Sequence, residues 1–467
     1  MSIALRLLVL ALVASCGSKG AYNCTSDTQC VRGGMSGTCA MQGFCAFPDP
    51  ACEGGFRYED NAGGGLANTC TTSVIDAGTI DAPTEESLCI TDVAFGRRFG
   101  CVLKMSGEVW CSGENANGQL GFGLAGVKTA TPMQVREVST NVIMDATAIA
   151  TGRNHACALR ANGTVWCWGA NESGQLGNNT NVQSAAAVQV LRTDGTPITA
   201  MAEVKAGYNH TCARSSAGGV LCWGAGNQAQ LGDGTMMGRS RAAPVLVAAM
   251  GAPFTGAVDL QVGAGHACVR KANDEMWCWG KNNDGAIGDA TNVHKVSPVQ
   301  VGSAKHIATS LWSTCRVNLD SSVSCSGWNR GAAFSLGIEE GFMQAANYLT
   351  PVKALQNAGG TPVMGVSKVA MGSGLCALMT DGSVRCSGDG NYGQNGTGAP
   401  RRVLTPVKHA DGTPLANVDR LVAKWPHVCA HKTTGAWECW GRNSEGEFGD
   451  GTFTNRGYPA PLRASCP

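Results

Sequence analysis

The chain has 467 residues, of which 64 are glycine and 23 are cysteine, and only 15% of the residues are charged. Lysine and arginine number 35 against 34 aspartates and glutamates, so the chain lacks the basic excess with which proteins bind nucleic acid or anionic membranes. The glycine content and low charge favour short strands joined by tight turns, and so many cysteines favour an oxidising compartment.

The first residues have the pattern of an export signal. Arg6 precedes an apolar run from residue 7 to residue 14, which is too short to cross a bilayer as a helix. The stretch Leu12-Val13-Ala14-Ser15-Cys16 resembles the lipobox of bacterial lipoproteins, in which a diacylglyceryl group is attached to the cysteine sulfur. We therefore expect a signal peptide at residues 1–15 and lipidation at Cys16, with a plain secretory signal as the alternative. Any membrane attachment would be by lipid only.

A cysteine-rich segment follows at residues 16–70. Its six further cysteines and few apolar residues predict a small module held together by disulfides, whose pairing the sequence leaves open. These cysteines are Cys24, Cys30, Cys39, Cys45, Cys52 and Cys70. Residues 71–88 are polar and without periodicity, which predicts a linker.

The remaining residues, 89–467, contain a repeat. Seven pairs of cysteines recur with a spacing of ten residues, and the first cysteines of successive pairs are 47 to 61 residues apart. The pairs are Cys101/Cys111, Cys157/Cys167, Cys212/Cys222, Cys268/Cys278, Cys315/Cys325, Cys376/Cys386 and Cys429/Cys439. Nine residues after the second cysteine most repeats have an apolar residue and glycine, as in Leu176-Gly177. The fifth repeat reaches Leu336-Gly337 two residues later, and the sixth has Asn395-Gly396.

Each cysteine pair is expected to join the two strands of a hairpin. Ala161-Asn162-Gly163 lies midway between Cys157 and Cys167, and five of the seven repeats have glycine at this third turn position. A three-residue loop with a type I turn and a G1 bulge needs a positive φ there, which glycine adopts without steric cost. Repeats four and five have Asp274 and Ser321 instead. This loop places the two cysteines directly opposite, with Cα atoms roughly 4.5 Å apart, so we predict seven such disulfides.

The pattern that recurs among the repeats of the chain is G-x-x-H-x-C-A-L, x-G-x-V-x-C-W-G and G-Q-L-G. It resembles the repeats of the regulator of chromosome condensation family, which form a seven-bladed β-propeller. The resemblance implies an all-β fold in which this propeller, at residues 89–467, follows the small disulfide-rich N-terminal module. Family members include an exchange factor for a GTPase, a plant ultraviolet receptor and a secreted inhibitor of β-lactamase, so the resemblance implies a rigid protein-binding disc without identifying its partner.

The period of the repeat also indicates where the ring closes. Cys89 and Cys466 fall six residues apart when both are mapped onto one repeat. We therefore predict that the two ends of the array meet and that Cys89 and Cys466 form a disulfide.

No residue is singled out as catalytic, cofactor-binding or metal-binding. Zinc sites commonly use close pairs of cysteines, whereas nine residues separate the cysteines of each pair here. Histidine recurs two residues before the first cysteine in four repeats, and other residue types take that place in the remaining three. These histidines are His155, His210, His266 and His427. In the family the matching histidine ties neighbouring blades. We expect the tryptophans in or beside the C-W-G strand to pack in the core, and these are Trp166, Trp223, Trp277, Trp279 and Trp440.

Two classes of function are compatible with this reading. The first, which we favour, is a lipid-anchored propeller in the cell envelope, at the outer membrane or cell surface, that binds an unknown protein or alternatively a glycan and is not an enzyme. The second is a propeller hydrolase or lyase that acts on a surface polymer at the channel mouth. A secreted enzyme inhibitor is a further alternative.

The structure can separate these classes. Convergent Asp, Glu, His and Arg side chains in one pocket would favour catalysis, because general acid and base groups must meet at the substrate. An apolar, aromatic-rich loop face would favour binding. The candidate binding loops are the long connections that follow each Leu-Gly motif, for example residues 122–131 and 335–348.

Overall fold

The structure is a computed structural model that describes residues 89–329, 336–338, 346–357, 359–397 and 399–462, and the backbone of five short strands between residues 31 and 58. The chain divides into two compact units, Met1–Ala82 and Pro83–Pro467. The predicted signal peptide, Cys16, the linker and Cys466 lie outside the described residues. Within the described part of the chain, no helix is long and apolar enough to cross a membrane.

In the first unit the described backbone forms two small antiparallel sheets. One pairs β1 (Val31–Arg32) with β2 (Met35–Ser36). The other has the order β3 (Thr38–Cys39), β4 (Cys45–Pro48) and β5 (Phe56–Tyr58). The cysteine side chains of this unit fall outside the described part, so their pairing stays open.

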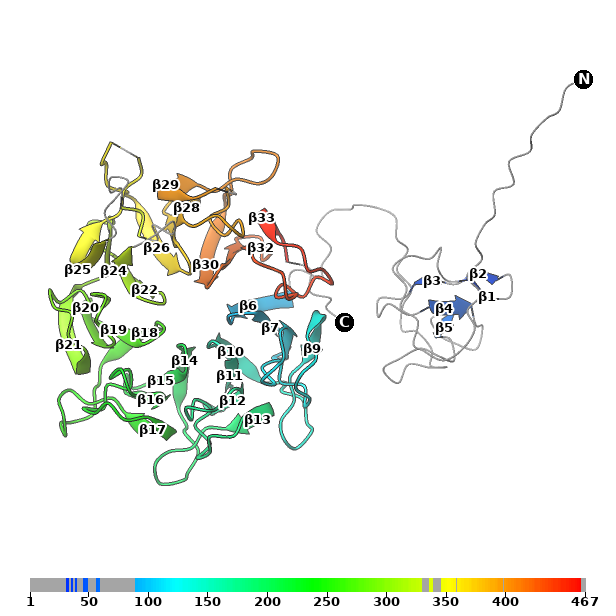
Figure 1. Cartoon of the computed structure of the whole chain (residues 1–467), viewed down its shortest axis with the longest axis horizontal. Coiled ribbons are helices and arrows are strands. Elements are labelled where there is room, and N and C mark those ends of the chain that lie inside the picture. The colour runs from blue at the N-terminus through cyan, green and yellow to red at the C-terminus, as the bar shows by residue number, and fades with distance from the viewer. Residues whose placement is uncertain are drawn as a thin grey trace, which may run out of the picture. The chain divides into compact units, whose positions relative to one another are not determined.

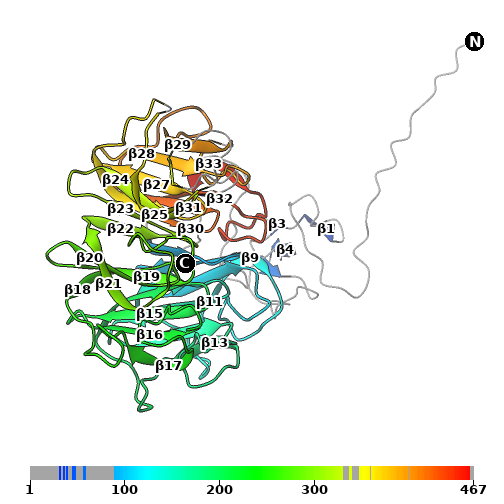
Figure 2. The ribbon, with the colours of Figure 1, turned by 60° about the vertical axis from the view of Figure 1, so that its left-hand side comes forward.

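The second unit is a seven-bladed β-propeller, which confirms the fold predicted from the repeat (Figure 1). Each blade is a four-stranded antiparallel sheet whose strands are consecutive in the sequence. The first strands of neighbouring blades contact one another around a central channel. Figure 2 shows the same ring obliquely, with the cyan first blade beside the red last blade.

The strands are as follows. Blade 1 has β6 (Ile90–Phe95), β7 (Phe99–Lys104), β8 (Val109–Gly113) and β9 (Thr129–Gln134); blade 2 has β10 (Ala146–Thr151), β11 (His155–Arg160), β12 (Val165–Gly169) and β13 (Ser184–Gln189); blade 3 has β14 (Met201–Ala206), β15 (His210–Ser215), β16 (Val220–Gly224) and β17 (Arg239–Pro244). Blade 4 has β18 (Ala257–Val262), β19 (His266–Lys271), β20 (Glu275–Gly280) and β21 (Lys295–Ser303); blade 5 has β22 (His306–Thr309), β23 (Ser313–Val317), β24 (Val323–Asn329) and β25 (Ala346–Lys353). Blade 6 has β26 (Val366–Met371), β27 (Leu375–Met379), β28 (Val384–Gly388) and β29 (Arg401–Pro406); blade 7 has β30 (Val418–Lys424), β31 (His427–Lys432), β32 (Trp437–Gly441) and β33 (Arg456–Pro461).

The second and third strands of each blade form the predicted hairpin. In blade 2, Cys157 pairs with Cys167 across β11 and β12, and the turn residue Gly163 has a φ of 75°. Asp274 and Ser321, at the same turn position in blades 4 and 5, have φ values of 63° and 64°. The turn therefore keeps its left-handed residue even in the two blades where a side chain makes that conformation less favourable.

All seven predicted disulfides within the hairpins are present. They are Cys101–Cys111, Cys157–Cys167, Cys212–Cys222, Cys268–Cys278, Cys315–Cys325, Cys376–Cys386 and Cys429–Cys439. The paired Cα atoms are 4.0 to 4.1 Å apart, closer than the expected spacing, and all fourteen cysteines are buried. Cys89 is also disulfide-bonded. Its predicted partner Cys466 is not among the described residues, so that pairing stays a prediction.

Neighbouring blades are tied by the tryptophan of the C-W-G motif. Trp168 is fully buried, and its Nε1–H donates to the backbone carbonyl oxygen of Gln119 in blade 1 at 2.9 Å. Trp223, Trp279 and Trp440 make the equivalent bond to the preceding blade. In blades 1 and 5 the hydroxyls of Ser112 and Ser326 replace the indole and donate over 3.4 and 3.3 Å. The core packing predicted for Trp223, Trp279 and Trp440 is confirmed, whereas Trp166 and Trp277 are half-buried and pack against the edges of the core clusters.

The glycine of the Leu-Gly motif makes room for this tryptophan. A Cβ at Gly121 would lie 2.8 Å from the Trp168 indole, and one at Gly177 would lie 2.8 Å from Trp223. Both glycines also have a positive φ, of 74° and 67°. The recurring Leu-Gly and C-W-G motifs are thus two halves of one contact between blades.

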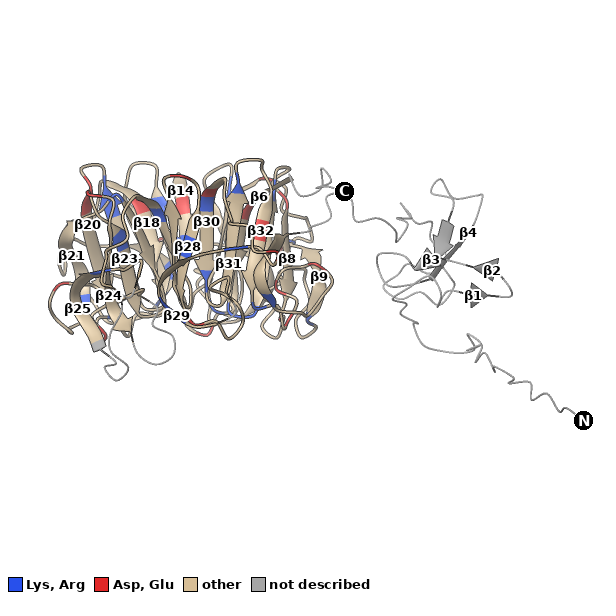
Figure 3. Cartoon of the chain, turned by 90° about the horizontal axis from the view of Figure 1, so that it is seen from above, with Lys and Arg blue, Asp and Glu red and all other residues tan. Residues whose placement is uncertain are grey.

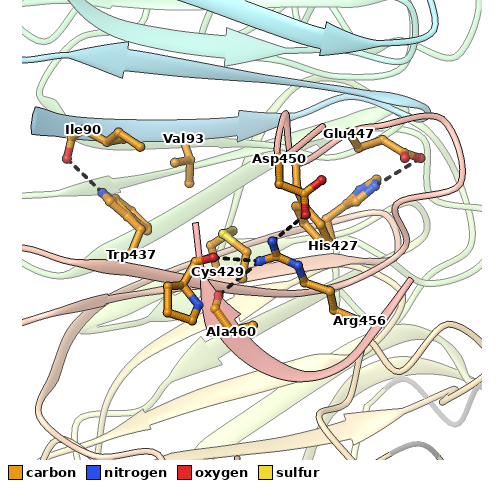
Figure 4. Close-up of a disulfide and its surroundings, with 12 residues drawn as sticks. Ile90, Val93, His427, Cys429, Trp437, Glu447, Asp450, Arg456 and Ala460 are labelled. Carbon is orange, nitrogen blue, oxygen red and sulfur yellow. Dashed lines mark hydrogen bonds and ion pairs between the residues drawn. A yellow bond between two sulfur atoms is a disulfide. The ribbon is translucent and has the colours of Figure 1, made fainter. Parts of the chain in front are cut away.

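The ring closes where blade 7 meets blade 1 (Figure 4). Trp437 Nε1 in β32 donates to the carbonyl oxygen of Ile90 in β6 at 3.0 Å, and Val93 lies in the same buried cluster as Trp437. The rings of His427 and Phe95 are stacked, with centroids 4.9 Å apart. Because each blade is one continuous segment of chain, side-chain contacts of this kind hold the two ends of the array together.

Candidate functional site

The connections between strands define two faces of the propeller. Because adjacent strands run in opposite directions, the connections after the first and third strands of a blade lie on the same face. In blade 2 these connections are residues 152–154 and 170–183. We call this face the loop face. The opposite face, which carries the hairpin turns and the links between blades, is the turn face.

The loop face exposes an apolar side chain at the same position in four consecutive blades. In blade 2 it is Val182, two residues before Ser184, which pairs with Gly169. The four residues are Val127, Val182, Met237 and Val293, with exposed fractions of 68, 71, 71 and 62%. They lie in the connections that the sequence singled out, although most of residues 335–348 fall outside the described part. These four side chains lie one to a blade, at a recurring exposed position where a partner that spans several blades would cover them.

The central channel holds a cavity of about 370 Å³, lined by the first strands of all seven blades. Asp92, His306, Lys368 and Arg420 occupy equivalent places in the first half of their strands and therefore lie toward the turn face. Lys205 lies in β14, two residues beyond the place that these four residues share in their strands. Figure 3 shows acidic and basic residues of β14, β18 and β30 toward one face of the disc.

The charges in this cavity are engaged with one another. Arg420 Nη1 lies 3.6 Å from Asp92 Oδ1, and Lys205 Nζ lies 3.6 Å from Glu203 Oε1. Burial raises the pKa of Asp92, while Arg420 opposes that rise; burial also lowers the pKa of His306. The cavity brings together residue types that would favour catalysis, but its lining carboxylate is already paired. Among the described residues, no group of three or more His, Cys, Asp or Glu side chains could hold a metal ion.

A lysine that departs from the repeat closes the loop-face end of the channel. Where the first strand ends, five blades have glycine and blade 5 has serine, but blade 7 has Lys424. Its Nζ donates to the backbone carbonyl oxygens of Thr151 in blade 2 and Ala206 in blade 3, the latter at 2.6 Å. Burial lowers the pKa of Lys424 to about 7, and the positive charge of Lys205 acts in the same direction.

Aromatic and cationic side chains surround this closed end. Trp425 follows Lys424, and its ring centroid lies 5.5 Å from that of Tyr208 in blade 3. The guanidinium carbon of Arg153 lies 4.5 Å from the centre of the Tyr208 ring. The backbone N–H of Arg153 also donates to the backbone carbonyl oxygen of Tyr208 at 3.1 Å, which fixes the two loops relative to each other. The loop face therefore has the aromatic, partly apolar character that favours binding.

The recurring histidines lie between blades. His155 is fully buried, and its Nε2 lies 2.9 Å from Thr211 Oγ1 in the next blade. Because that hydroxyl donates to the Gln175 carbonyl oxygen at 3.1 Å, the imidazole must be the donor. Burial lowers the pKa of His155 and His210 to about 3 and that of His266 to about 4. His155, His210 and His266 are therefore neutral at neutral pH. His155 and His266 link neighbouring blades through Thr211 and Thr314.

Lys424, Trp425, Tyr208 and Arg153 were not singled out from the sequence. A signal was available for Lys424, since the place five residues before the first cysteine is glycine in the first four repeats and lysine in the seventh. No comparable signal marks Tyr208, because the residue at its position differs in almost every blade. Its meeting with Trp425 depends on closure of the ring.

Comparison with known proteins agrees with the fold. Residues 90–119, 146–175, 202–230 and 257–286 match one model of the regulator of chromosome condensation (RCC1) repeat, and residues 106–159 and 162–214 match a second model of that repeat. The chain is thus a seven-bladed propeller that contains RCC1 repeats. The human E3 ubiquitin-protein ligase HERC2 is 25% identical over 344 residues, which are 72% of this chain but only 7% of that ligase. The ultraviolet-B receptor UVR8 of Arabidopsis thaliana is 26% identical over 324 residues, covering 68% of this chain and 69% of the receptor.

Solved structures share the propeller. Prp20p of Saccharomyces cerevisiae superimposes with a TM-score of 0.60 at 18% identity, over 77% of this chain and 87% of that one. Human WBSCR16 gives a TM-score of 0.59 at 18% identity, over 79% and 94%. Prp20p was characterised for its binding to Gsp1p and histones, and yeast RCC1 (Prp20) has been crystallised with Kap60.

Proposed function

We propose that this chain is an exported, lipid-anchored module that binds a protein through the loop face of its propeller. The observation that carries the proposal is the exposed apolar side chain that recurs at one position of that face in four blades, from Val127 in blade 1 to Val293 in blade 4. Burial of one such side chain against a partner contributes up to about 2 kcal/mol. Protein binding by the yeast relative Prp20p supports the same reading.

The rigidity of the propeller also supports a binding role. Each blade has its own disulfide, and indole and imidazole groups such as those of Trp168 and His155 tie it to its neighbours. Loops held by such a frame lose little conformational entropy when a partner binds, so more of the contact energy remains as affinity.

The disulfides support export as well. Buried structural disulfides persist in oxidising compartments and are rare in reducing ones. The charged and apolar start of the chain and the lipobox-like sequence that ends at Cys16 support a lipid anchor in the cell envelope, at the outer membrane or cell surface. Metabolic labelling with tritiated palmitate should mark the full chain and fail to mark the Cys16→Ala variant. Equal labelling of both chains, or of neither, would exclude the anchor.

The binding face can be tested by photo-crosslinking on intact cells. A benzophenone amino acid at Met237 on the loop face is compared with one at Met105, which lies in a hairpin turn on the opposite face. The two methionines are matched, with exposed fractions of 71 and 73%. We expect a discrete protein adduct from position 237 and none from position 105. A carbohydrate adduct at 237 would identify a glycan partner instead, and equal adducts from both positions would contradict the choice of face.

A second candidate function is catalysis in the channel, which the meeting of Asp92, His306 and Arg420 in one cavity favours. Because Asp92 is paired with Arg420, a substrate would have to displace Arg420 before the carboxyl group could act as acid or base. Turnover of a surface polymer that is lost in Asp92→Asn would establish this function. An inhibitor of an enzyme would be a special case of the protein binding proposed above.

A further inference from the structure

Three cavities on the loop face share lining residues and so form one continuous groove. Tyr208 and Ala264 line both the small cavity beside the closed channel mouth and a middle cavity of about 360 Å³. Ala225 and Asn227 line both the middle cavity and an outer one of about 400 Å³. The groove runs from Trp425 at the centre to Arg239 in the outer strand of blade 3. We call it the blade-3 groove.

The loop that follows the third strand is held differently in blade 3 than in blade 2. In blade 2, Asn171 Oδ1 accepts from the Leu176 N–H at 2.9 Å, and its Nδ2 donates to the Thr180 carbonyl oxygen at 2.9 Å. This asparagine, which holds the loop to the blade, is replaced in blade 3 by Gly226. The Met237 carbonyl oxygen occupies the freed space, 1.9 Å from where a Cβ of residue 226 would stand. The outer cavity lies beside this contact and is lined by Gly226 and Gly238.

The lining of the groove combines aromatic rings with side-chain amides. Tyr208 and Trp312 line its middle part, and both are half-buried, so part of each ring faces solvent. Asn227 and Gln228 lie between them and the outer cavity. Aromatic faces pack against apolar or planar groups, and amides can both donate and accept hydrogen bonds, which is the pattern that an extended peptide backbone requires.

The charge of the groove is positive. None of the described residues that line the three cavities is Asp or Glu, whereas Lys424, Lys281 and Arg239 are among them. Outside the lining, Asp284 lies 3.3 Å from Lys281 Nζ and Asp233 pairs with Arg239. The uncompensated positive charge is therefore at the inner end.

Arg153 adds to this charge at the inner end. Its guanidinium group covers Tyr208, and among the described residues its buried Nε has no hydrogen-bond partner. Lys424 lies at the same end and donates to backbone carbonyl oxygens, and burial lowers its pKa to about 7. A carboxylate placed here would meet the Arg153 guanidinium group and no competing acid from the lining.

We propose that the blade-3 groove binds an extended acidic segment of the partner protein. Carboxylates of the segment lie toward Arg153, an apolar or aromatic side chain sits between Tyr208 and Trp312, and the segment's backbone bonds to the amides of Asn227 and Gln228. This inference rests on the proposed function and adds the class of ligand. A peptide is favoured over a neutral glycan because a neutral glycan would leave the cations without a partner.

The test starts with selection from a displayed library of random peptides of about 12 residues, which span roughly 40 Å when extended. The library is selected on the full chain in mild detergent. The selected peptides are then titrated against the chain by calorimetry, beside lysine-substituted versions and a neutral oligosaccharide, chitohexaose. We expect the selected peptides to combine Asp or Glu with an aromatic or large apolar residue, and to lose about tenfold or more in affinity when Lys replaces the acids.

Four variants locate the site. Tyr208→Ala, Trp312→Ala and Arg153→Gln should each weaken the selected peptide about tenfold. Tyr392→Ala is the control, because Tyr392 is an aromatic residue of the loop face, in blade 6, that is more exposed than Tyr208 and does not line the groove. It should leave the affinity unchanged within about twofold. Unchanged circular dichroism and melting temperature show that each variant is folded.

Four outcomes would overturn the inference. The library shows no enrichment, the enriched peptides are basic, the affinity is unchanged in the three groove variants, or chitohexaose binds and peptides do not. Failure of the groove inference can be told apart from failure of the proposed function. If the crosslink at position 237 persists in the Trp312→Ala chain, the loop face binds a protein without the groove. If the crosslink is absent from every loop-face position, the proposed function itself fails.

Discussion

The Nζ of Lys424 in β30 lies 2.6 Å from the carbonyl oxygen of Ala206 in β14, so blade 7 is tied to blade 3 across the channel. Lys424 also donates to the Thr151 carbonyl oxygen in blade 2, whereas the bonds of the recurring motifs join neighbouring blades, as Trp168 does with Gln119. A tie across the centre fixes the inner ends of distant strands and holds Trp425 next to Tyr208. The channel is thereby closed on the face that we assign to binding.

Replacement of Lys424 by methionine should change how stability depends on pH. Burial lowers the pKa of Lys424 to about 7 in the folded chain, while an unfolded lysine keeps its usual value near 10.5. Between these values the unfolded state binds the additional proton, so the stability of the wild type should rise with pH by up to about 1.4 kcal/mol per pH unit. Lys424→Met should lose this rise in urea unfolding between neutral and alkaline pH. Parallel curves for the two chains would exclude the assignment.

The buried histidines should destabilise the propeller in acid. The pKa of His155 and His210 is about 3 and that of His266 about 4, against 6.5 for an exposed histidine. Below pH 6.5 these histidines therefore bind protons in the unfolded state but not in the folded state. As the pH falls, each histidine lowers the free energy of unfolding by up to about 1.4 kcal/mol per pH unit. His155→Gln keeps a donor for Thr211 and should make the acid slope shallower by about one proton. An unchanged slope would mean that His155 is protonated in the folded state.

The indole nitrogen of Trp168 should matter more than that of Trp166. Trp168→Phe keeps a large ring but leaves the buried Gln119 carbonyl oxygen without its donor, which costs about 1–3 kcal/mol. Trp166 is half-buried, and its Nε1–H donates only within its own hairpin, to Thr164 Oγ1 at 3.3 Å. Trp166→Phe, the matched control, should cost less than about 0.5 kcal/mol. Equal losses in chemical denaturation would show that the bond between blades contributes nothing.

The hairpins are the part of the fold that the sequence predicts best. Cys157, Gly163 and Cys167 lie within one short segment, so the period-two alternation of strands and the turn chemistry determine their positions without knowledge of the ring. The φ of Ser321 shows the limit of that local argument, because serine has no intrinsic preference for the left-handed region. Its turn conformation follows from the strands on either side.

The candidate site was predicted only in outline. The long loops were expected to bind, and they carry Val182 and Met237, but the lining of the blade-3 groove comes from blades 2 to 7. Tyr208, Trp312 and Trp425 are far apart in the sequence and meet only because seven repeats close into a ring. The pattern within one repeat carries no information about which loops end up opposite each other.

The two ends of the array should be linked covalently. Each blade is continuous, so no shared strand fastens blade 1 to blade 7 among the described residues, and a Cys89–Cys466 disulfide would supply that fastening. Peptide mass spectrometry without reduction should recover the two cysteines as one linked species. Recovery of Cys89 linked to a cysteine of the N-terminal module would disprove this closure.

The central claim is that the loop face is the binding surface. The most direct test is to measure how tightly the crosslinked partner binds surface variants of this chain. Dissociation constants would be measured for the wild type, Val182→Asp, Met237→Asp and Met105→Asp. A charge in the middle of a buried contact costs several kcal/mol, so both loop-face variants should bind about tenfold more weakly or worse, and Met105→Asp should match the wild type. Wild-type affinity in the loop-face variants, or an equal loss in Met105→Asp, would contradict the account.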